Sequence, residues 1–159
     1  MIKKIAVIGT GVIGTGWIIR CLAHNFKVVA YDKDPKLKKK INLKNFQYVT
    51  SLEIALKDAD FIQENATENY KIKTKLMNLI GKYAKNNAII SSSSSGLLPT
   101  KIYSKCKNPA RTMIGHPFNP VYLCPGVEVV AGKKTKTKFL NKANKFYKSI
   151  SMNPIIVKK

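Results

Sequence analysis

Short apolar runs alternate with amphipathic segments along the chain. Residues 5–8, Ile-Ala-Val-Ile, are uninterrupted apolar residues and predict a strand buried on both faces. Residues 12–24 follow with helical periodicity, and residues 27–31 form a second apolar run. Strands separated by helices predict an α/β fold with a doubly wound, mainly parallel sheet and helices on both faces. Further strands are predicted at 47–49, 61–62, 88–90, 111–114, 127–130 and 154–157.

The remaining segments predict helices of unequal length. A short helix capped by Ser51 and another that starts at Pro99 are predicted. Longer helices are predicted over 68–84 and 135–149. His24 closes the first helix, and we expect it to cap that helix's C-terminus. Residues 33–46 are rich in lysine and weakly patterned, which predicts a short helix and a loop. The 68–84 helix is expected to bury one stripe, made of Ile72, Leu76, Leu79, Ile80 and Tyr83.

Length and charge narrow the function classes. The 159 residues are enough for one domain with its own core, and the formal net charge is +21. Such a charge is compatible with binding to nucleic acid. Only Arg20 and Arg111 are arginines, however, and arginine is the residue best suited to bases and phosphates. We therefore expect that the positive charge reflects a drift of the composition toward lysine. No specific nucleic-acid partner is predicted, only a salt-sensitive attraction to polyanions.

The cysteines and the N-terminus bear on the compartment. Cys21, Cys106 and Cys124 are odd in number and far apart, so neither a disulfide framework nor a metal site is expected. Free thiols are typical of a reducing cytoplasm, which is the predicted location. Lys3 and Lys4 precede an apolar run that imitates a signal peptide. Glycines interrupt that run and no cleavage site follows it, so neither a leader nor a membrane anchor is predicted.

The glycines of this first segment form a dinucleotide-binding fingerprint. Residues 9–14 read Gly-Thr-Gly-Val-Ile-Gly, follow a predicted strand and open a predicted helix, which is the context of a Rossmann fold. Gly9 allows a tight turn, Gly11 lets the backbone approach a pyrophosphate, and Gly14 lets the helix pack closely. The first helical amides, at Val12 and Ile13, point toward the phosphates.

Asp32 completes this fingerprint, because it ends the second predicted strand. A carboxylate there accepts hydrogen bonds from the adenosine ribose and repels a 2′-phosphate. The predicted cofactor is therefore NAD rather than NADP, although Lys33 and Lys36 weaken the repulsion. The alternative is an ordinary glycine turn with an aspartate at a strand end.

Side chains that could take part in catalysis follow three later predicted strands. Gln63-Glu64, the serines at 91–95 and His116 each follow a predicted strand, so all should meet at the carboxyl edge of the sheet. His116 lies between Gly115 and Pro117, which predicts a rigid turn, and it can act as a base near neutral pH. Glu128 can orient its imidazole. The serine run is also compatible with a plain polar loop, Glu64 with a solvated carboxylate, and Glu128 with a water-facing strand residue.

The order of these motifs resembles the 3-hydroxyacyl-CoA dehydrogenase family. The fingerprint, the serine run with Gly-Leu-Leu-Pro-Thr, the sequence Gly-His-Pro-Phe-Asn-Pro and the sequence Val-Glu-Val-Val all carry the likeness. The resemblance implies NAD-linked oxidation of a 3-hydroxyl to a 3-ketone, on a small hydroxy acid or a short-chain 3-hydroxyacyl-CoA. It implies catalytic His116, Glu128 and Ser95, substrate contacts from Ser95 and Asn119, and Glu64 beside the nicotinamide half of the cofactor.

Two departures from the family pattern affect this expectation. The family has a helical domain after the NAD-binding domain, whereas this chain reaches only Lys159, and the segment between Asp32 and Ser51 is shorter than usual. We therefore expect residues 1–159 to be a single, truncated NAD-binding domain. Exposed apolar surface would then favour a homo-oligomer or a separate chain that supplies the helical domain. A non-catalytic NAD-binding module is the alternative to an enzyme.

Overall fold

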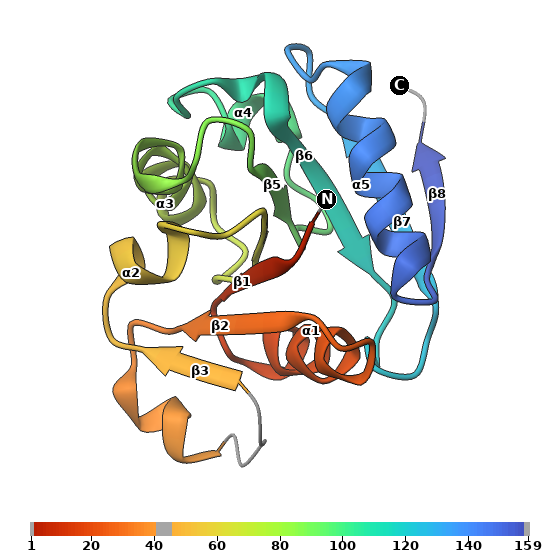
Figure 1. Ribbon diagram of the computed structural model, residues 1–159. Helices are drawn as coiled ribbons and strands as arrows, with labels where there is room; N and C mark the ends of the chain where they lie inside the picture. Colours follow the sequence, from red (N-terminus) through yellow and green to blue (C-terminus); the bar gives the residue numbers. More distant parts are fainter. Residues whose placement is uncertain (1, 41–45, 158–159) are drawn as a thin grey trace.

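The strands of the chain form one mixed sheet between two layers of helices (Figure 1). The computed structural model describes residues 2–40 and 46–157. In that part of the chain, the sheet has eight strands in the order β3-β2-β1-β4-β5-β6-β7-β8. The strands are β1 Lys4–Ile8, β2 Lys27–Tyr31, β3 Phe46–Val49, β4 Phe61–Glu64, β5 Ile89–Ser92, β6 Thr112–Pro117, β7 Gly126–Ala131 and β8 Asn153–Val157. The helices are α1 Val12–Ala23, α2 Leu52–Leu56, α3 Tyr70–Tyr83, α4 Pro99–Ile102 and α5 Thr137–Ser149.

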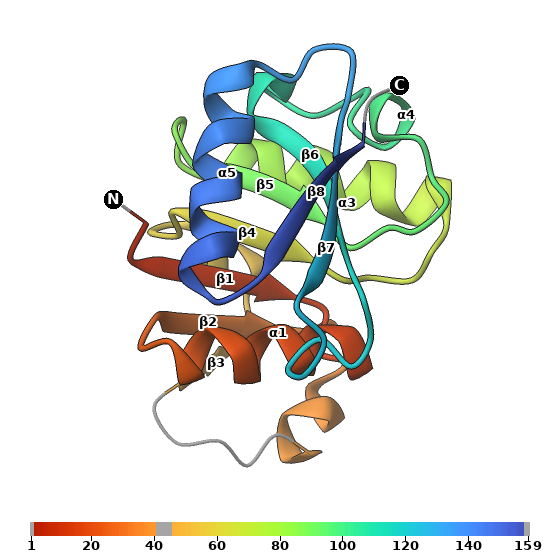
Figure 2. The same cartoon turned by 90° about the vertical axis from the view of Figure 1, so that its right-hand side faces the viewer.

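Side-chain alternation along the central strand β1 supplies two hydrophobic cores. Successive side chains of a strand point to opposite faces of the sheet. Ile5 and Val7 join a cluster with Trp17 of α1 and Phe146 of α5, whereas Ala6 and Ile8 join a second cluster with residues of α2, α3 and α4. Figure 2 shows α1 and α5 in front of the sheet and α3 behind it. Both faces are thus covered, as the uninterrupted apolar run of β1 predicts.

The order in which strands are added to the sheet reverses between β1 and β4. From β1 the sheet extends to β2 and β3 on one side, and from β4 to β8 on the other, while β1 and β4 are parallel neighbours. A ligand crevice lies at such a switch point, beyond the carboxyl ends of the two strands. Here those ends are followed by Gly9 and by Asn65, and the Gly9 backbone packs against that of Asn65.

One prediction about local structure was wrong, and another was right only in part. His116 does not lie in a turn but in β6, where it pairs with Glu128 of the antiparallel strand β7. The prolines near it therefore end an extended strand, which suits their fixed backbone angle as well as a turn does. The predicted buried stripe of α3 is right in part. Ile80 is buried and Leu76 and Tyr83 pack against the second core, but Ile72 is exposed, and α3 buries Lys73, Met77 and Gly81 as well.

The other predicted elements agree with the structure. The segment that imitates a signal peptide is β1 followed by α1, and Ser51 caps α2 by accepting from the amide of Ile54. His24 ends α1, and its Nδ1 lies 2.9 Å from the carbonyl oxygen of Arg20. The expected short helix after residue 33 is a 3₁₀ turn, Pro35–Lys40, whereas the rest of the expected loop, 41–45, lies outside the described residues.

Both arginines are buried and serve the backbone. Arg20 donates to carbonyl oxygens of Val121, Cys124, Ile150 and Ser151, and Arg111 donates to those of Gly81, Lys85 and Ala88. The exposed positive charge of the described chain is therefore lysine. Among the described helices, none is both long enough and apolar enough to cross a membrane.

Candidate active site

The turn after β1 is shaped by its glycines. Gly9 has φ +87°, and a Cβ atom there would come within 2.9 Å of the Asn65 backbone. A Cβ on Gly14 would overlap the carbonyl oxygen of Gly9, so α1 rests directly on the turn. A Cβ on Gly11 would meet nothing within 4 Å. The space above Gly11 is thus open on the side where a ligand can approach the backbone.

The N-terminus of α1 suits an anion. Gly11 is the N-cap and provides no side-chain hydrogen bond, and the first turn holds no acidic residue. The positive end of the helix dipole is therefore not neutralised by a neighbouring side chain. Val12 is 76% exposed, and Ile13 lines the adjacent cavity. This turn can hold a pyrophosphate such as that of NAD, which is the fit that the fingerprint requires.

Asp32 directly follows β2 and lies beside the turn. Its Oδ2 accepts from the Thr10 amide at 2.7 Å and from the Thr10 hydroxyl at 3.3 Å, and its Oδ1 accepts from the Asp34 amide at 3.0 Å. A carboxylate has roughly four acceptor positions. Asp32 therefore retains capacity for a ribose hydroxyl while its orientation is fixed by the backbone.

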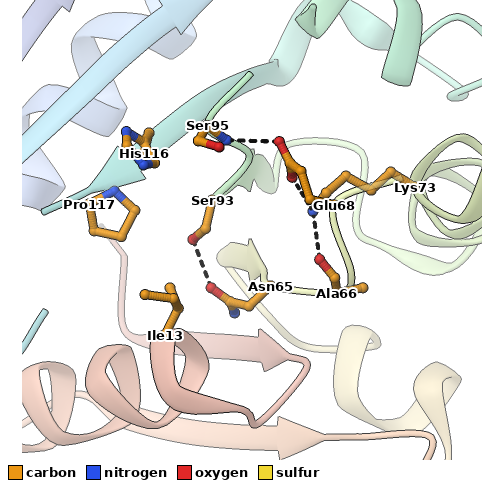
Figure 3. A pocket seen from close by; sticks show the side chains of 9 residues that line it. All are labelled: Ile13, Asn65, Ala66, Glu68, Lys73, Ser93, Ser95, His116 and Pro117. Atoms are coloured by element: carbon orange, nitrogen blue, oxygen red, sulfur yellow. Dashed lines mark hydrogen bonds and ion pairs between the residues drawn. The ribbon is translucent and has the colours of Figure 1, made fainter. Parts of the chain in front are cut away.

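A cavity of about 240 Å³ opens next to the glycine turn, at the carboxyl edge of the sheet. Side chains from four separate parts of the chain converge on it (Figure 3). The residues that line it are Ile13, Asn65, Ala66, Glu68, Lys73, Ser93, Ser95, His116 and Pro117. The structure thus brings the predicted Ser95 and His116 to one cavity, beside a residue of the dinucleotide fingerprint.

His116 and Glu128 form a hydrogen-bonded pair across β6 and β7. The His116 Nδ1 atom lies 3.0 Å from Glu128 Oε2, and the two residues are direct partners in the antiparallel register. Their side chains are 29% and 40% exposed. When the Nδ1–H of the neutral imidazole donates a hydrogen bond to the Glu128 carboxylate, the free electron pair of the ring lies on Nε2. The pair can therefore take a proton from a molecule in the cavity.

The ends of β4, β5 and β6 converge as expected, and the side chain of Gln63 connects them by hydrogen bonds. Its Nε2 donates to the Ser93 hydroxyl at 2.8 Å and to the Gly115 carbonyl at 3.1 Å, and its Oε1 accepts from Tyr147 at 3.0 Å. A Cβ on Gly115 would overlap the Tyr147 hydroxyl, so this network packs tightly beneath His116. One buried side chain thus joins β4, β5 and β6 below the cavity.

The five serines are not an undifferentiated polar loop. Ser91 bonds with Tyr147, Ser92 donates to Glu64, Ser93 donates to Asn65, and Ser94 donates to Glu68. Among the described residues, the hydroxyl of Ser95 has no hydrogen-bond partner. Ser95 is exposed and lines the cavity, so it is the serine whose hydroxyl is available to a ligand.

Glu64 is buried next to the cavity, behind Lys73. Its side chain is 0% exposed and pairs with Lys73, whose Nζ lies 2.9 Å from Oε1 and 3.0 Å from Oε2. Oε1 also accepts from the Ala66 amide at 2.6 Å. The carboxylate therefore points into the protein, beneath the cavity, where it fixes the segment that follows β4. The alternative of a solvated loop carboxylate is therefore wrong, whereas a place near the nicotinamide half of the cofactor stays a prediction.

Asn119, the other predicted substrate contact, lies outside this cavity, and its contact with substrate stays a prediction. It is exposed in the loop after β6 and does not line the cavity, and its carbonyl oxygen lies 3.7 Å from Cys124 Sγ.

Cys21 and Cys106 are buried, and burial raises their pKa to about 12 and about 11, which keeps both thiols protonated near neutral pH. Within the described residues no group of histidine, cysteine and carboxylate side chains could hold a metal ion.

Sequence reasoning missed Asn65, Glu68 and Lys73. Asn65 directly follows β4, so the rule that placed Glu64 at the sheet edge applies to it as well. Lys73 occupies a position on the buried stripe of α3, and a lysine at such a position signals a buried acidic partner. Glu68 stands just before the N-cap residue Asn69 and gives no comparable signal.

Comparison with known proteins gives one family. The family model described as 3-hydroxyacyl-CoA dehydrogenase, NAD binding domain, matches residues 4–44 and 36–159. Its two matched ranges overlap at residues 36–44, within the segment between Asp32 and Ser51 that is shorter than usual for the family.

Relatives of known name cover nearly the whole chain. L-carnitine dehydrogenase of Oceanobacillus iheyensis is 41% identical, over 99% of this chain and 58% of the relative. L-carnitine dehydrogenase of Pseudomonas syringae is 40% identical, over 99% and 56%. The chain therefore spans less than two thirds of these relatives.

Two solved structures share the fold. The NAD⁺-dependent 5-formyl-3-hydroxy-2-methylpyridine 4-carboxylic acid 5-dehydrogenase has a TM-score of 0.93 at 28% identity, covering 100% of this chain and 58% of that one. The (S)-3-hydroxybutyryl-CoA dehydrogenase of Ralstonia eutropha has a TM-score of 0.90 at 27% identity, covering 100% and 64%.

Proposed function

The chain belongs to the 3-hydroxyacyl-CoA dehydrogenase family, as its NAD-binding domain, and from this premise we propose that it oxidises a 3-hydroxyl to a 3-ketone on a small hydroxy acid. The cofactor is NAD. The observation that carries the proposal is the His116–Glu128 pair, 3.0 Å apart, at a cavity that also holds the free Ser95 hydroxyl and Ile13 of the fingerprint.

The proposed roles of the side chains follow from their hydrogen bonds. Glu128 holds the Nδ1–H of His116, so Nε2 accepts the proton of the substrate hydroxyl and Glu128 stabilises the resulting positive charge. The Ser95 hydroxyl donates a hydrogen bond to the same substrate oxygen. When bound, NAD supplies the acceptor for the hydride that leaves the carbinol carbon. The proton and the hydride together account for the two hydrogens removed.

The cofactor roles are proposed from the open turn. Gly9, Gly11 and Gly14 shape the backbone that receives the pyrophosphate, and the amides of Val12 and Ile13 begin the helix that faces it. Asp32 receives the adenosine ribose and repels a 2′-phosphate. In this proposal Glu64 acts beneath the cavity and Asn119 meets substrate only if the loop after β6 takes another arrangement.

L-carnitine is the proposed substrate, because two curated relatives at 41% and 40% identity bear its name. Two alternatives are kept as outcomes of the test. A short-chain 3-hydroxyacyl-CoA is supported by the likeness to a 3-hydroxybutyryl-CoA dehydrogenase. A non-catalytic NAD-binding module is the other alternative, since the family model that matches the chain describes an NAD binding domain.

Partners and compartment are part of the same proposal. We propose that residues 1–159 form one domain that works as a homo-oligomer or with a separate helical chain. The exposed apolar side chains near the C-terminal strands support this, since such surface is usually covered: Phe118, Tyr122, Leu123, Ile155, Ile156 and Val157. The free thiols fit a reducing cytoplasm. The burial of both arginines disfavours specific nucleic-acid binding.

An absorbance assay of NADH formation tests this function. The purified chain is mixed with NAD and L-carnitine, and in parallel with NAD and 3-hydroxybutyryl-CoA. NADH formation with L-carnitine is the expected result. NADH formation with 3-hydroxybutyryl-CoA but not with L-carnitine would show that L-carnitine is not the substrate and favour the 3-hydroxyacyl-CoA. A folded chain that binds NADH and forms none with either compound would contradict the enzyme proposal and favour the NAD-binding module.

A further inference from the structure

We propose that Glu68 is the positioning residue of this site, because it holds the loop that presents Ser95 to the cavity opposite His116. This inference rests on the proposed function for the role of Ser95. Glu68 itself need not touch the substrate. Figure 3 shows its carboxylate beside the Ser95 backbone, on the far side of Ser95 from His116.

One oxygen of Glu68 receives three donors from three consecutive residues. Oε1 accepts from the Ser94 hydroxyl at 2.5 Å, from the Ser95 amide at 3.0 Å and from the Gly96 amide at 3.1 Å. Hydrogen bonds to an ionised acceptor are stronger than those between neutral groups. The chain has just left β5 at Ser92, and Ser95 and Gly96 are exposed. At Ser95 and Gly96, the two exposed residues of the loop, both backbone amides are therefore held by this one carboxylate.

The other oxygen of Glu68 ties the loop to the protein interior. Oε2 lies 3.7 Å from Lys73 Nζ, and Lys73 is only 1% exposed. The same ammonium group pairs with the fully buried Glu64 and donates to the Ala66 carbonyl at 2.9 Å. Glu68, itself 40% exposed, thus connects a solvent-facing loop to a buried ion pair whose position is fixed by β4 and α3.

The loop needs such a connection because of how its serines are used. The hydroxyls of Ser91 to Ser94 all bond within the protein, and that of Ser95 is left to reach outward. A free hydroxyl can be aimed only through its backbone, and Glu68 binds that backbone directly. A displacement of a reacting group by about 1 Å can lower a rate by about 10²-fold.

The charge state of Glu68 agrees with this role. Partial burial opposes ionisation, but the bonds from Ser94, Ser95 and Gly96 and the charge of Lys73 outweigh it and lower the pKa of Glu68 below its ordinary value. The carboxylate is therefore ionised at neutral pH, and its protonation in acid should be reported by the two amides that it binds.

The first arm of the test is an NMR titration of the full chain with Glu68→Gln, Glu68→Ala and, as a matched control, Glu53→Gln, whose side chain is exposed on α2. In the unaltered chain the Ser95 and Gly96 amide shifts should titrate together, below the ordinary glutamate range, and this titration should vanish in both Glu68 variants. In Glu68→Ala both amides should exchange with solvent at least about tenfold faster. Ser95 and Gly96 amide shifts that change neither with pH nor with substitution of Glu68 would overturn the proposal.

The second arm is steady-state kinetics with L-carnitine and NAD. Glu68→Ala should lower kcat by about 10-fold to 10²-fold with little change in KM, Glu68→Gln should retain more activity, and the Kd for NADH should stay within about twofold. The double variant Glu68→Ala with Ser95→Ala should be no slower than Ser95→Ala alone. Fully additive losses would contradict action through Ser95.

The two arms separate the inference from the function on which it rests. No turnover in the unaltered chain, together with titrating amides, would count against the proposed function while supporting the hold of Glu68 on the loop. Turnover with amides that do not titrate would count against Glu68 alone.

Discussion

The two ends of the candidate site are built in different ways. The cofactor end, from Gly9 to Asp32, belongs to one continuous β1-α1-β2 unit. Its shape is set mainly by glycines, which have no side chain, and by the Asp32 carboxylate that holds the Thr10 amide. The catalytic end is assembled from β4, β5, β6, β7 and the start of α3, and it is held by side chains: Gln63, Lys73 and the His116–Glu128 pair. A local motif makes the first, and long-range contacts make the second.

This difference predicts that the two ends fail differently. A substitution at the cofactor end should change the affinity for NADH and leave the fold intact where no atom is displaced. A substitution under the catalytic end should change stability or turnover and leave NADH affinity nearly constant. Each of the following variants tests one side of that division.

The largest effect is expected from Lys73→Met, under the catalytic end. It leaves the Glu64 carboxylate buried without its partner, since both side chains are at most 1% exposed. Removing one member of a buried pair destabilises by about 3–5 kcal/mol, a large share of the stability of a domain. Urea unfolding measures it. Lys85→Met, which breaks the more exposed pair with Asp60, is the matched control and should lose no more than about 1 kcal/mol.

The effect of His116→Ala should fall on turnover alone. Loss of a general base lowers kcat by about 10²-fold to 10⁴-fold. Because His116 lies in β6, outside the glycine turn, the Kd for NADH should change by less than about twofold. Rate assays and calorimetry measure the two quantities. A His116→Ala variant that loses NADH binding would show that the two ends are not separable.

Asp32→Ala should act at the cofactor end only. It removes charge-assisted hydrogen bonds to the ribose, which are worth about 1.5–3 kcal/mol, so NADH should bind about 10-fold to 10²-fold more weakly. NADPH, freed from repulsion, should lose less, and the preference for NADH should shrink. Asp34→Ala, two residues along the same loop, is the control. Unchanged selectivity in Asp32→Ala would remove Asp32 from the ribose.

Gly11→Ala is the most delicate test of the same end. Its new methyl group meets no protein atom within 4 Å, so the thermal unfolding midpoint should be unchanged. The methyl group would stand where the pyrophosphate approaches, and we expect about a tenfold loss of NADH affinity. Gly14→Ala is the contrast, because its methyl group would overlap the Gly9 carbonyl and destabilise the protein. Equal stability of the two variants would contradict the described turn.

The contrast between the two ends also explains what the sequence could predict. The glycine turn and Asp32 follow from local rules, because their spacing within one β-α-β unit sets their geometry. The meeting of the serine run with His116 follows from the rule for strand ends, and the sequence makes Glu128 a candidate partner of that imidazole. The choice of Ser95 among the five serines comes from the family likeness. The inward turn of Glu64 and the role of Glu68 do not follow, because both depend on how α3 rotates to bury Lys73.

The most direct test of the account is a calorimetric titration of the purified chain with NADH and with NADPH at moderate salt. Specific binding at the glycine turn should survive salt that screens a purely lysine-driven attraction. The account predicts saturable binding of one NADH per chain, with NADPH clearly weaker. A folded sample that binds neither nucleotide, or binds both equally and only at low salt, would contradict it.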